Sequence, residues 1–186
     1  MEKVLSAIKN RRSIRKYRAK EVSADQIRCL LESARLAPSG NNTQPWRFIV
    51  VKDKEMIQKL ADLSHNQQWM TSAPVIIACI ADMRSRVTDD IEVKVDENDS
   101  SNNLKKIIRD TSIAIEHIVL QAEELGLSTC WIAWFTQDEI RPLLEIPKDK
   151  YLVALLTVGY KDQDPEPRPR HEFENIVFYE KWECTK

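Results

Sequence analysis

Apolar residues recur at three- and four-residue steps in several stretches of the chain, which predicts helices. These stretches cover residues 2–10, 23–37, 54–63 and 104–125. The second opens with Ser23-Ala-Asp-Gln26, the pattern of a capping box, and ends at Pro38. The last is the longest and stops at Gly126, and its apolar stripe is wide enough to form the centre of the core or of a dimer interface. A second capping box, beginning at Thr136, predicts a short helix over residues 136–144.

Short apolar runs rich in β-branched and aromatic residues predict four strands. They cover residues 46–51, 74–81, 129–135 and 151–160. Helices dominate the first part of the chain and then alternate with strands, which is the pattern of an α+β fold with one sheet. The 186 residues fit a single domain with an arm.

Two segments do not fit helix or strand. Residues 82–103 hold seven acids against three bases and an Asn/Ser-rich end, which is compatible with a solvated lid or with a surface insertion that has no role. Residues 161–186 contain Pro165, Pro167 and Pro169, so we expect an extended arm that runs over a surface of this chain or of a partner.

Composition excludes several classes of function. The net charge of −1 gives no reason to expect nucleic acid or an anionic membrane as a partner. No apolar run reaches the roughly 20 residues of a membrane span, and the N-terminus lacks a signal sequence, so a soluble cytoplasmic protein is expected. The four cysteines are far apart and lack the spacing of metal ligands, so no metal is expected. With three glycines in all, neither GxGxxG nor a P-loop can be written.

Two segments carry the chemistry. Residues 9–20 contain seven basic residues and no acid, and arginine forks with the Ser13 hydroxyl suit a phosphate. A solvated basic face or a basic arm that binds RNA would give a similar run. Residues 38–46 form an amide-rich turn that ends at Trp46, which suits a planar ring with hydrogen-bonding edges. Pro45 excludes helical backbone at Gln44 and projects its amide outward, although a plain turn between helix and strand would have the same residues.

These segments resemble a known family. Residues 11–17, Arg-Arg-Ser-Ile-Arg-Lys-Tyr, and residues 37–48, Ala-Pro-Ser-Gly-Asn-Asn-Thr-Gln-Pro-Trp-Arg-Phe, are similar to the N-terminal signature of the nitroreductase family of FMN-dependent NAD(P)H oxidoreductases. The order of later segments is similar too, including residues 126–132, residues 158–160, Arg168 and Arg170. The resemblance covers nearly the whole length.

The resemblance implies a nitroreductase-like domain over residues 1–186, with a mainly antiparallel sheet of four to five strands flanked by helices. It also implies a homodimer with FMN at the subunit interface, the long helix at that interface and the arm of residues 161–186 packed on the partner. The candidate FMN-binding residues are Arg11, Arg12, Ser13, Arg15, Pro38, Ser39, Gly40, Asn42, Gln44, Gln67, Ala133, Trp134, Arg168 and Arg170.

The resemblance also implies which part of the cofactor each of these residues would contact. Arg11, Arg12 and Ser13 would hold the phosphate and ribityl chain, with the arginines of the arm closing over the phosphate. Arg15 and Gln67 would meet the polar edge of the ring, and residues 38–42 would reach it from the other subunit. The backbone at residues 133–134 would face flavin N5.

One position departs from the family pattern. Many short members have a glycine after the Trp-Ile pair, whereas this chain has Ala133-Trp134. The alanine keeps the backbone N–H, and Trp134 either lines the substrate pocket or points into the core.

The implied activity is transfer of hydride from NADH or NADPH to FMN and reduction of a small organic acceptor, such as a nitroaromatic or quinone, by a ping-pong scheme. No acid or base is identified. Three alternatives remain open: a specialised flavoprotein such as a single-metabolite reductase, dehalogenase or flavin-consuming enzyme, a non-catalytic flavin sensor, and a basic-arm nucleic-acid binder.

Overall fold

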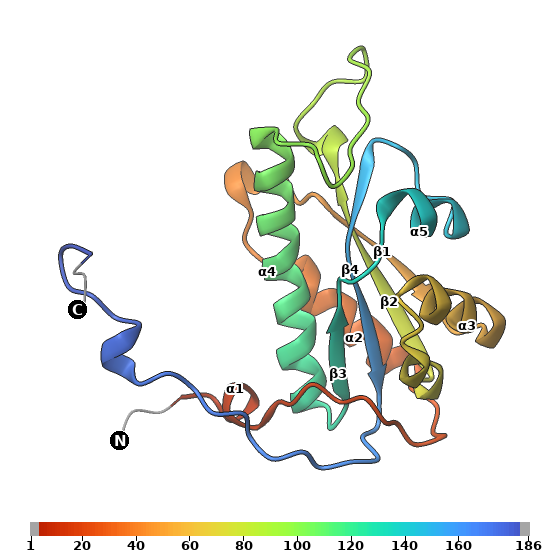
Figure 1. The fold of residues 1–186 in the computed structure, drawn as a ribbon, viewed down its shortest axis with the longest axis vertical. Helices are drawn as coiled ribbons and strands as arrows, with labels where there is room; N and C mark the ends of the chain where they lie inside the picture. The colour runs from red at the N-terminus through yellow and green to blue at the C-terminus, as the bar shows by residue number, and fades with distance from the viewer. Residues whose placement is uncertain (1–3, 183–186) are drawn as a thin grey trace.

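The computed structural model describes residues 4–182 and contains one antiparallel sheet, with strand order β1-β2-β4-β3 (Figure 1). The strands are β1 (Trp46–Val51), β2 (Val75–Asp82), β3 (Ser128–Ile132) and β4 (Lys150–Gly159). Every residue of β2 is buried, because helices cover both faces of the sheet. The α+β prediction with a single antiparallel sheet is confirmed.

Helices form a layer on each side of the sheet. They are α1 (Ser6–Asn10), α2 (Ala24–Arg35), α3 (Lys54–Leu63), α4 (Asn102–Glu124) and α5 (Gln137–Leu143). The main core lies between the sheet and α2 with α4, and a second core lies between the sheet and α3 with α5 (Figure 1). Within residues 4–182, no helix combines the length and apolar character needed to cross a membrane.

Local sequence chemistry explains several of these boundaries. The Ser23 hydroxyl accepts a hydrogen bond from the Gln26 backbone at 3.2 Å, and the Gln26 side chain accepts one from the Ser23 N–H at 3.1 Å, so the first capping box is confirmed. Gly126 has φ +69° directly after the end of α4, as predicted for a helix stop.

Three boundary predictions are wrong. The hydroxyl of Thr136 donates to the Glu139 carboxylate at 2.6 Å and caps no backbone N–H, so the second capping box does not form. The strand predicted over residues 129–135 ends at Ile132, the last residue paired with β4. The helix predicted over residues 2–10 begins at Ser6, and residues 1–3 lie outside the described part of the chain.

The acidic segment of residues 82–103 is more ordered than its composition suggests. A 3₁₀ turn, Met83–Ser85, follows β2, and the side chain of Val95 is completely buried. The Val95 N–H also donates to the Lys148 carbonyl at 3.0 Å. The segment is therefore attached to the core at its base and near its middle.

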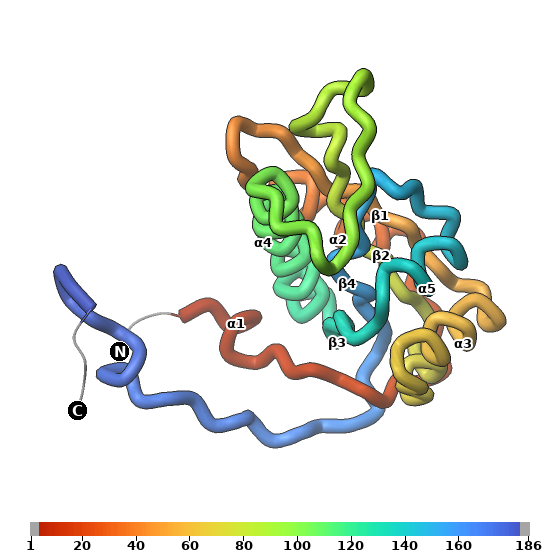
Figure 2. Tube along the Cα trace, turned by 45° about the horizontal axis from the view of Figure 1, so that its top comes forward, coloured from red at the N-terminus to blue at the C-terminus, as the bar shows by residue number. Residues whose placement is uncertain are grey.

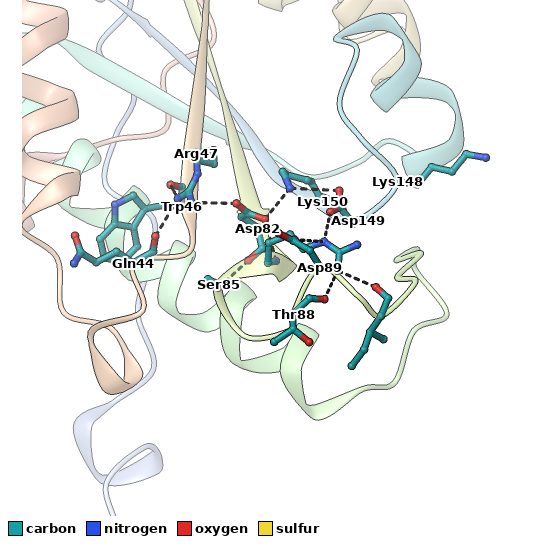
Figure 3. Close-up of polar contacts among 12 residues, drawn as sticks. Gln44, Trp46, Arg47, Asp82, Ser85, Thr88, Asp89, Lys148, Asp149 and Lys150 are labelled. Atoms are coloured by element: carbon teal, nitrogen blue, oxygen red, sulfur yellow. Dashed lines mark hydrogen bonds and ion pairs between the residues drawn. The ribbon is translucent and has the colours of Figure 1, made fainter.

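An ion network fixes that base at the ends of three strands (Figure 3). The buried carboxylate of Asp82 accepts from Lys150 Nζ at 2.8 Å and lies 3.0 Å from Arg47 Nη2. Beside it, Asp149 accepts from Arg84 Nε at 2.7 Å. Burial disfavours the charged form of Asp149, but Arg84 and Lys150 outweigh it and hold the pKa of this carboxyl below its usual 3.8.

Replacing Asp149 tests this network. Because its folded pKa is lowered, the carboxylate stabilises the fold above about pH 4 and loses this effect as the pH falls through the folded pKa. We expect Asp149→Asn to lower the free energy of unfolding at pH 7 by about 1.5–3 kcal/mol. The difference from the wild type should narrow between about pH 4 and pH 2, as measured by urea unfolding.

The matched control is Asp89→Asn. The Asp89 carboxylate lies 3.6 Å from the same Arg84 Nε but is 96% exposed, so its loss should change stability by less than about 0.5 kcal/mol. Equal losses in both variants would contradict a special role for Asp149.

Candidate cofactor site

The basic segment of residues 11–15 is held along the edge strand of the sheet. The Ile14 N–H donates to the Thr129 carbonyl of β3 at 2.9 Å, and Ser13 pairs with Thr129 in a parallel bridge. Extended backbone alternates its side chains. Ile14 is therefore buried, whereas Ser13 and Arg15 are exposed.

Tyr17 secures the end of this segment. Its buried hydroxyl lies 2.7 Å from the Ile14 carbonyl and 2.7 Å from Thr157 Oγ1. Burial raises the pKa of Tyr17 well above its usual value, so the phenol stays protonated and can donate. Close contacts with Tyr17 and Pro74 explain Gly159, where a Cβ would lie 2.8 Å from Cδ1 of the tyrosine and 2.7 Å from Cδ of the proline.

A cavity of about 650 Å³ lies beside this segment, between it and the C-terminal arm. In Figures 1 and 2 the N-terminal segment, in red, and the arm, in blue, run side by side. Six of the predicted cofactor residues line the cavity: Arg11, Arg12, Ser13, Arg15, Arg168 and Arg170. Two distant parts of the sequence thus place five arginines around one space.

Most of these arginines have no carboxylate partner. Of the five arginines that line the cavity, only Arg11 forms an ion pair within residues 4–182, with Glu116 at 3.7 Å. Arg12 donates to the carbonyls of Lys9 and Arg11 at 2.8 Å each, and the Arg15 guanidinium lies 5.7 Å from the centre of the Trp69 ring. Such an excess of unpaired cations favours an anion with several oxygen atoms.

The amide-rich turn has an unusual backbone. Asn41, Asn42 and Gln44 all adopt left-handed φ angles, of 56°, 55° and 45°. Non-glycine residues rarely adopt this conformation, and it tends to occur at functional sites. Gln44 is thus excluded from right-handed helix, as Pro45 predicted, but its amide points back toward the Asn42 carbonyl at 3.4 Å. The Ser39 hydroxyl accepts the Gln44 N–H at 3.0 Å and closes the turn.

The turn and the basic segment lie apart within one chain. Gly40 is bound to the first half of α4, because its N–H donates to Asp110 at 3.3 Å and its carbonyl accepts from Arg86 at 3.2 Å. Arg11 pairs with Glu116 further along the helix, and α1 lies near the opposite end of α4 (Figure 1). The predicted residues of the turn and those of the basic segment therefore form two separate groups in the chain.

The remaining predicted residues lie near the end of β3. Ala133 and Trp134 follow Ile132, and Gln67 precedes the 3₁₀ turn Gln68–Ser72. The Trp134 side chain is 65% exposed, so it does not belong to the core. Its ring stacks on His65, with 4.1 Å between centroids and 24° between planes.

Sequence reasoning missed several residues of this region. His65 stacks on Trp134, the Trp69 ring lies 5.7 Å from the Arg15 guanidinium, and Pro165, Glu166 and Pro167 line the arginine cavity. The prolines indicated an extended arm but gave no sign of what the arm would face.

Across residues 4–182, no cluster of three or more metal-binding side chains occurs. Burial raises the pKa of the Cys130 thiol.

Comparison with known proteins adds an independent result. The profile of the nitroreductase family matches residues 8–160. A protein of Archaeoglobus fulgidus assigned as an NADH dehydrogenase/NAD(P)H nitroreductase is 33% identical over 169 residues, covering 88% of each chain. An FMN reductase [NAD(P)H] of Bacillus subtilis is 29% identical over 180 residues, covering 91% of this chain and 70% of its own.

Solved structures show the same fold. The structure of B. megaterium NfrA1 has a TM-score of 0.86 and 30% identity, covering 96% of this chain and 74% of its own. An FMN-dependent nitroreductase from Clostridium difficile has a TM-score of 0.74 and 30% identity, covering 95% and 98%. The four-stranded antiparallel sheet, the long helix α4 and the sequence matches agree, and the chain belongs to the nitroreductase family of NAD(P)H oxidoreductases.

Proposed function

We propose that this protein binds FMN and uses it to reduce a small organic acceptor, such as a nitroaromatic or a quinone, with NADH or NADPH as the donor. The observation that carries the proposal is the arginine cavity, which gathers cations from both ends of the chain around the exposed Ser13 hydroxyl. When bound, FMN supplies the hydride chemistry and lets donor and acceptor use one site in turn.

The residues of the cavity suit the phosphate end of FMN. Arg11 and Arg12 present planar forks, and Ser13 is exposed next to the buried Ile14. Arg168 and Arg170 close the cavity from the arm. A dianionic phosphate needs several charge-assisted hydrogen bonds, and this set of side chains can supply them.

The ring end of FMN would lie further along the segment. Beyond Ser13 the segment crosses the end of the sheet, because Tyr17 forms a bridge with Lys161 just past β4. This course brings the Arg15 guanidinium within 5.7 Å of the Trp69 ring centre, two residues after Gln67. Arg15 follows Ser13 on the same exposed face, where its charge would favour electron density on the pyrimidine edge. Gln67 and the Ala133 N–H would contribute hydrogen bonds, and exposed Trp134 would form a wall for the acceptor.

We further propose that the working unit is a homodimer, in which the turn of residues 38–44 completes the site of the partner. The chain exposes 11,954 Å², whereas a compact monomer of 21.6 kDa exposes about 9,200 Å². The excess includes apolar side chains on α1 and the arm: Val4, Leu5, Ile8, Phe173, Ile176, Tyr179 and Trp182. The arm projects from the body in Figures 1 and 2, which supports packing on a second copy.

The activity is tested by anaerobic reduction. We expect the purified protein to be yellow, NADH or NADPH to bleach its visible band, and a nitroaromatic or quinone to restore it. A sensor would bind FMN without bleaching by either nicotinamide, and that result would refute the oxidoreductase proposal. The absorbance spectrum measures both steps.

The phosphate role is tested by Arg11→Ala combined with Ser13→Ala. Charge-assisted hydrogen bonds contribute about 1.5–3 kcal/mol each, so the double variant should weaken FMN binding by about 100-fold or more. Fluorescence titration of the FMN-free protein measures the dissociation constant. Arg18→Ala is the control, because Arg18 is exposed nearby but does not line the cavity. Unchanged FMN affinity in the double variant would remove the basis for the proposed site.

The shared site is tested by mixing two defective variants. One carries Arg11→Ala with Ser13→Ala, and the other carries Gly40→Leu, whose Cβ would meet Arg86 Nη2 at 2.9 Å and displace the turn. Each alone should bind FMN weakly. In mixed dimers one site receives both intact segments, so random mixing should restore about one quarter of the sites. If the site lay within one chain, no FMN binding would return.

A further inference from the structure

A second, smaller pocket of about 340 Å³ lies against the first half of α4, on the side of the amide-rich turn. It is lined by Gly40, Asn41, Arg86, Lys106, Arg109 and Asp110. The arginine cavity shares none of these residues. Pockets of this size accommodate small ligands or parts of larger ones.

The helix repeat and one close contact build this pocket. Lys106, Arg109 and Asp110 are three and four residues apart, which places them on one face of α4. Gly40 lies so close to this face that any Cβ would be 2.9 Å from Arg86 Nη2. The turn and the helix therefore enclose the space from two sides.

The charges of the pocket are not balanced. Asp110 accepts from Arg86 Nη2 at 3.0 Å and from the Gly40 N–H at 3.3 Å, so its charge is already partnered. Within residues 4–182, Lys106 and Arg109 form no ion pair, although both are exposed. The Nε–H of Arg86 is buried and has no acceptor. Lys106 and Arg109 thus present two free cations to one space, beside the Arg86 guanidinium, in a chain whose net charge is −1.

We propose that this pocket binds a phosphate group of the nicotinamide donor. Arginine and lysine side chains are the groups that recognise phosphate oxygens. The inference rests on the proposed function, in which residues 38–44 face the flavin of the partner. A nicotinamide stacked on that flavin would extend its phosphates outward past the turn. The phosphate would be either the 2′-phosphate found only in NADPH or the pyrophosphate that NADH shares.

The test replaces Lys106 and Arg109 together by glutamine and titrates the FMN-loaded protein with 2′-AMP, 5′-AMP and ADP by calorimetry. Loss of two charge-assisted contacts should weaken binding of the preferred probe by about tenfold or more. Lys105→Gln is the matched control, because Lys105 is the adjacent exposed lysine on α4 and does not line the pocket. The control should change binding by less than about twofold.

The probes separate the two sources of phosphate. If the pocket holds the 2′-phosphate, 2′-AMP should bind more tightly than 5′-AMP, and the double variant should raise KM for NADPH alone. If it holds the pyrophosphate, ADP should bind most tightly and KM should rise for both donors. In either case we expect kcat to change little, since Lys106 and Arg109 are not among the residues proposed to contact the flavin.

Two results would overturn the inference: unchanged probe binding in the double variant, or an equal loss in Lys105→Gln that reflects surface charge alone. These outcomes are distinct from failure of the proposed function. A protein that fails to bind FMN contradicts the proposed function, whereas full FMN content with unaltered probe binding contradicts only the phosphate pocket.

Discussion

The pairing of residues 13–17 with the edge of the sheet is the constraint on which the candidate site depends. One backbone hydrogen bond to Thr129 and the buried Tyr17 hydroxyl hold the segment in extended form. The extended backbone that this pairing maintains is what places the Ser13 and Arg15 side chains on the same side of the segment. Tyr17 needs the bare backbone of Gly159 to reach its partners, so a residue at the end of β4 helps determine where the basic segment lies.

The long helix α4 sets the second constraint. The two groups of predicted site residues both contact it: Gly40 is bound to Asp110, and Arg11 pairs with Glu116 six residues later. With 3.6 residues per turn, positions 110 and 116 project from the helix about 120° apart, so Gly40 and Arg11 meet different sides of α4. Either the two groups serve different purposes, or a second copy brings them together. The exposed apolar side chains of α1 and the arm favour the second explanation, because a monomer would leave them in water.

Patterns that depend on neighbouring residues predicted much of the fold. The strand Trp46–Val51 and the helix Lys54–Leu63 have the predicted bounds, since alternating and helical apolar spacing report directly on burial. Thr136 shows the limit of such patterns. Its sequence matches a capping box, but the hydroxyl binds the Glu139 side chain instead of a backbone N–H. Choosing between two acceptors within one turn depends on side-chain geometry that the spacing of residues does not encode.

The candidate site was less predictable, because it depends on contacts between distant segments. The sequence identifies arginines, but whether an arginine is free depends on the carboxylates that the fold brings near it. Arg84 is bound by Asp149, 65 residues away, and Arg86 by Asp110, whereas Lys106 and Arg109 have no such partner within the described residues. All four basic residues follow the start of the acidic segment, and composition alone does not distinguish the paired ones from the unpaired ones. Their different electrostatic roles arise only when β2, the turn at Gly40 and α4 are in place.

The stacking of His65 on Trp134 likewise depends on the fold, since it joins the end of α3 to the end of β3. Trp134 is 65% exposed, so it does not point into the core, and the residue that its ring contacts is far away in the sequence.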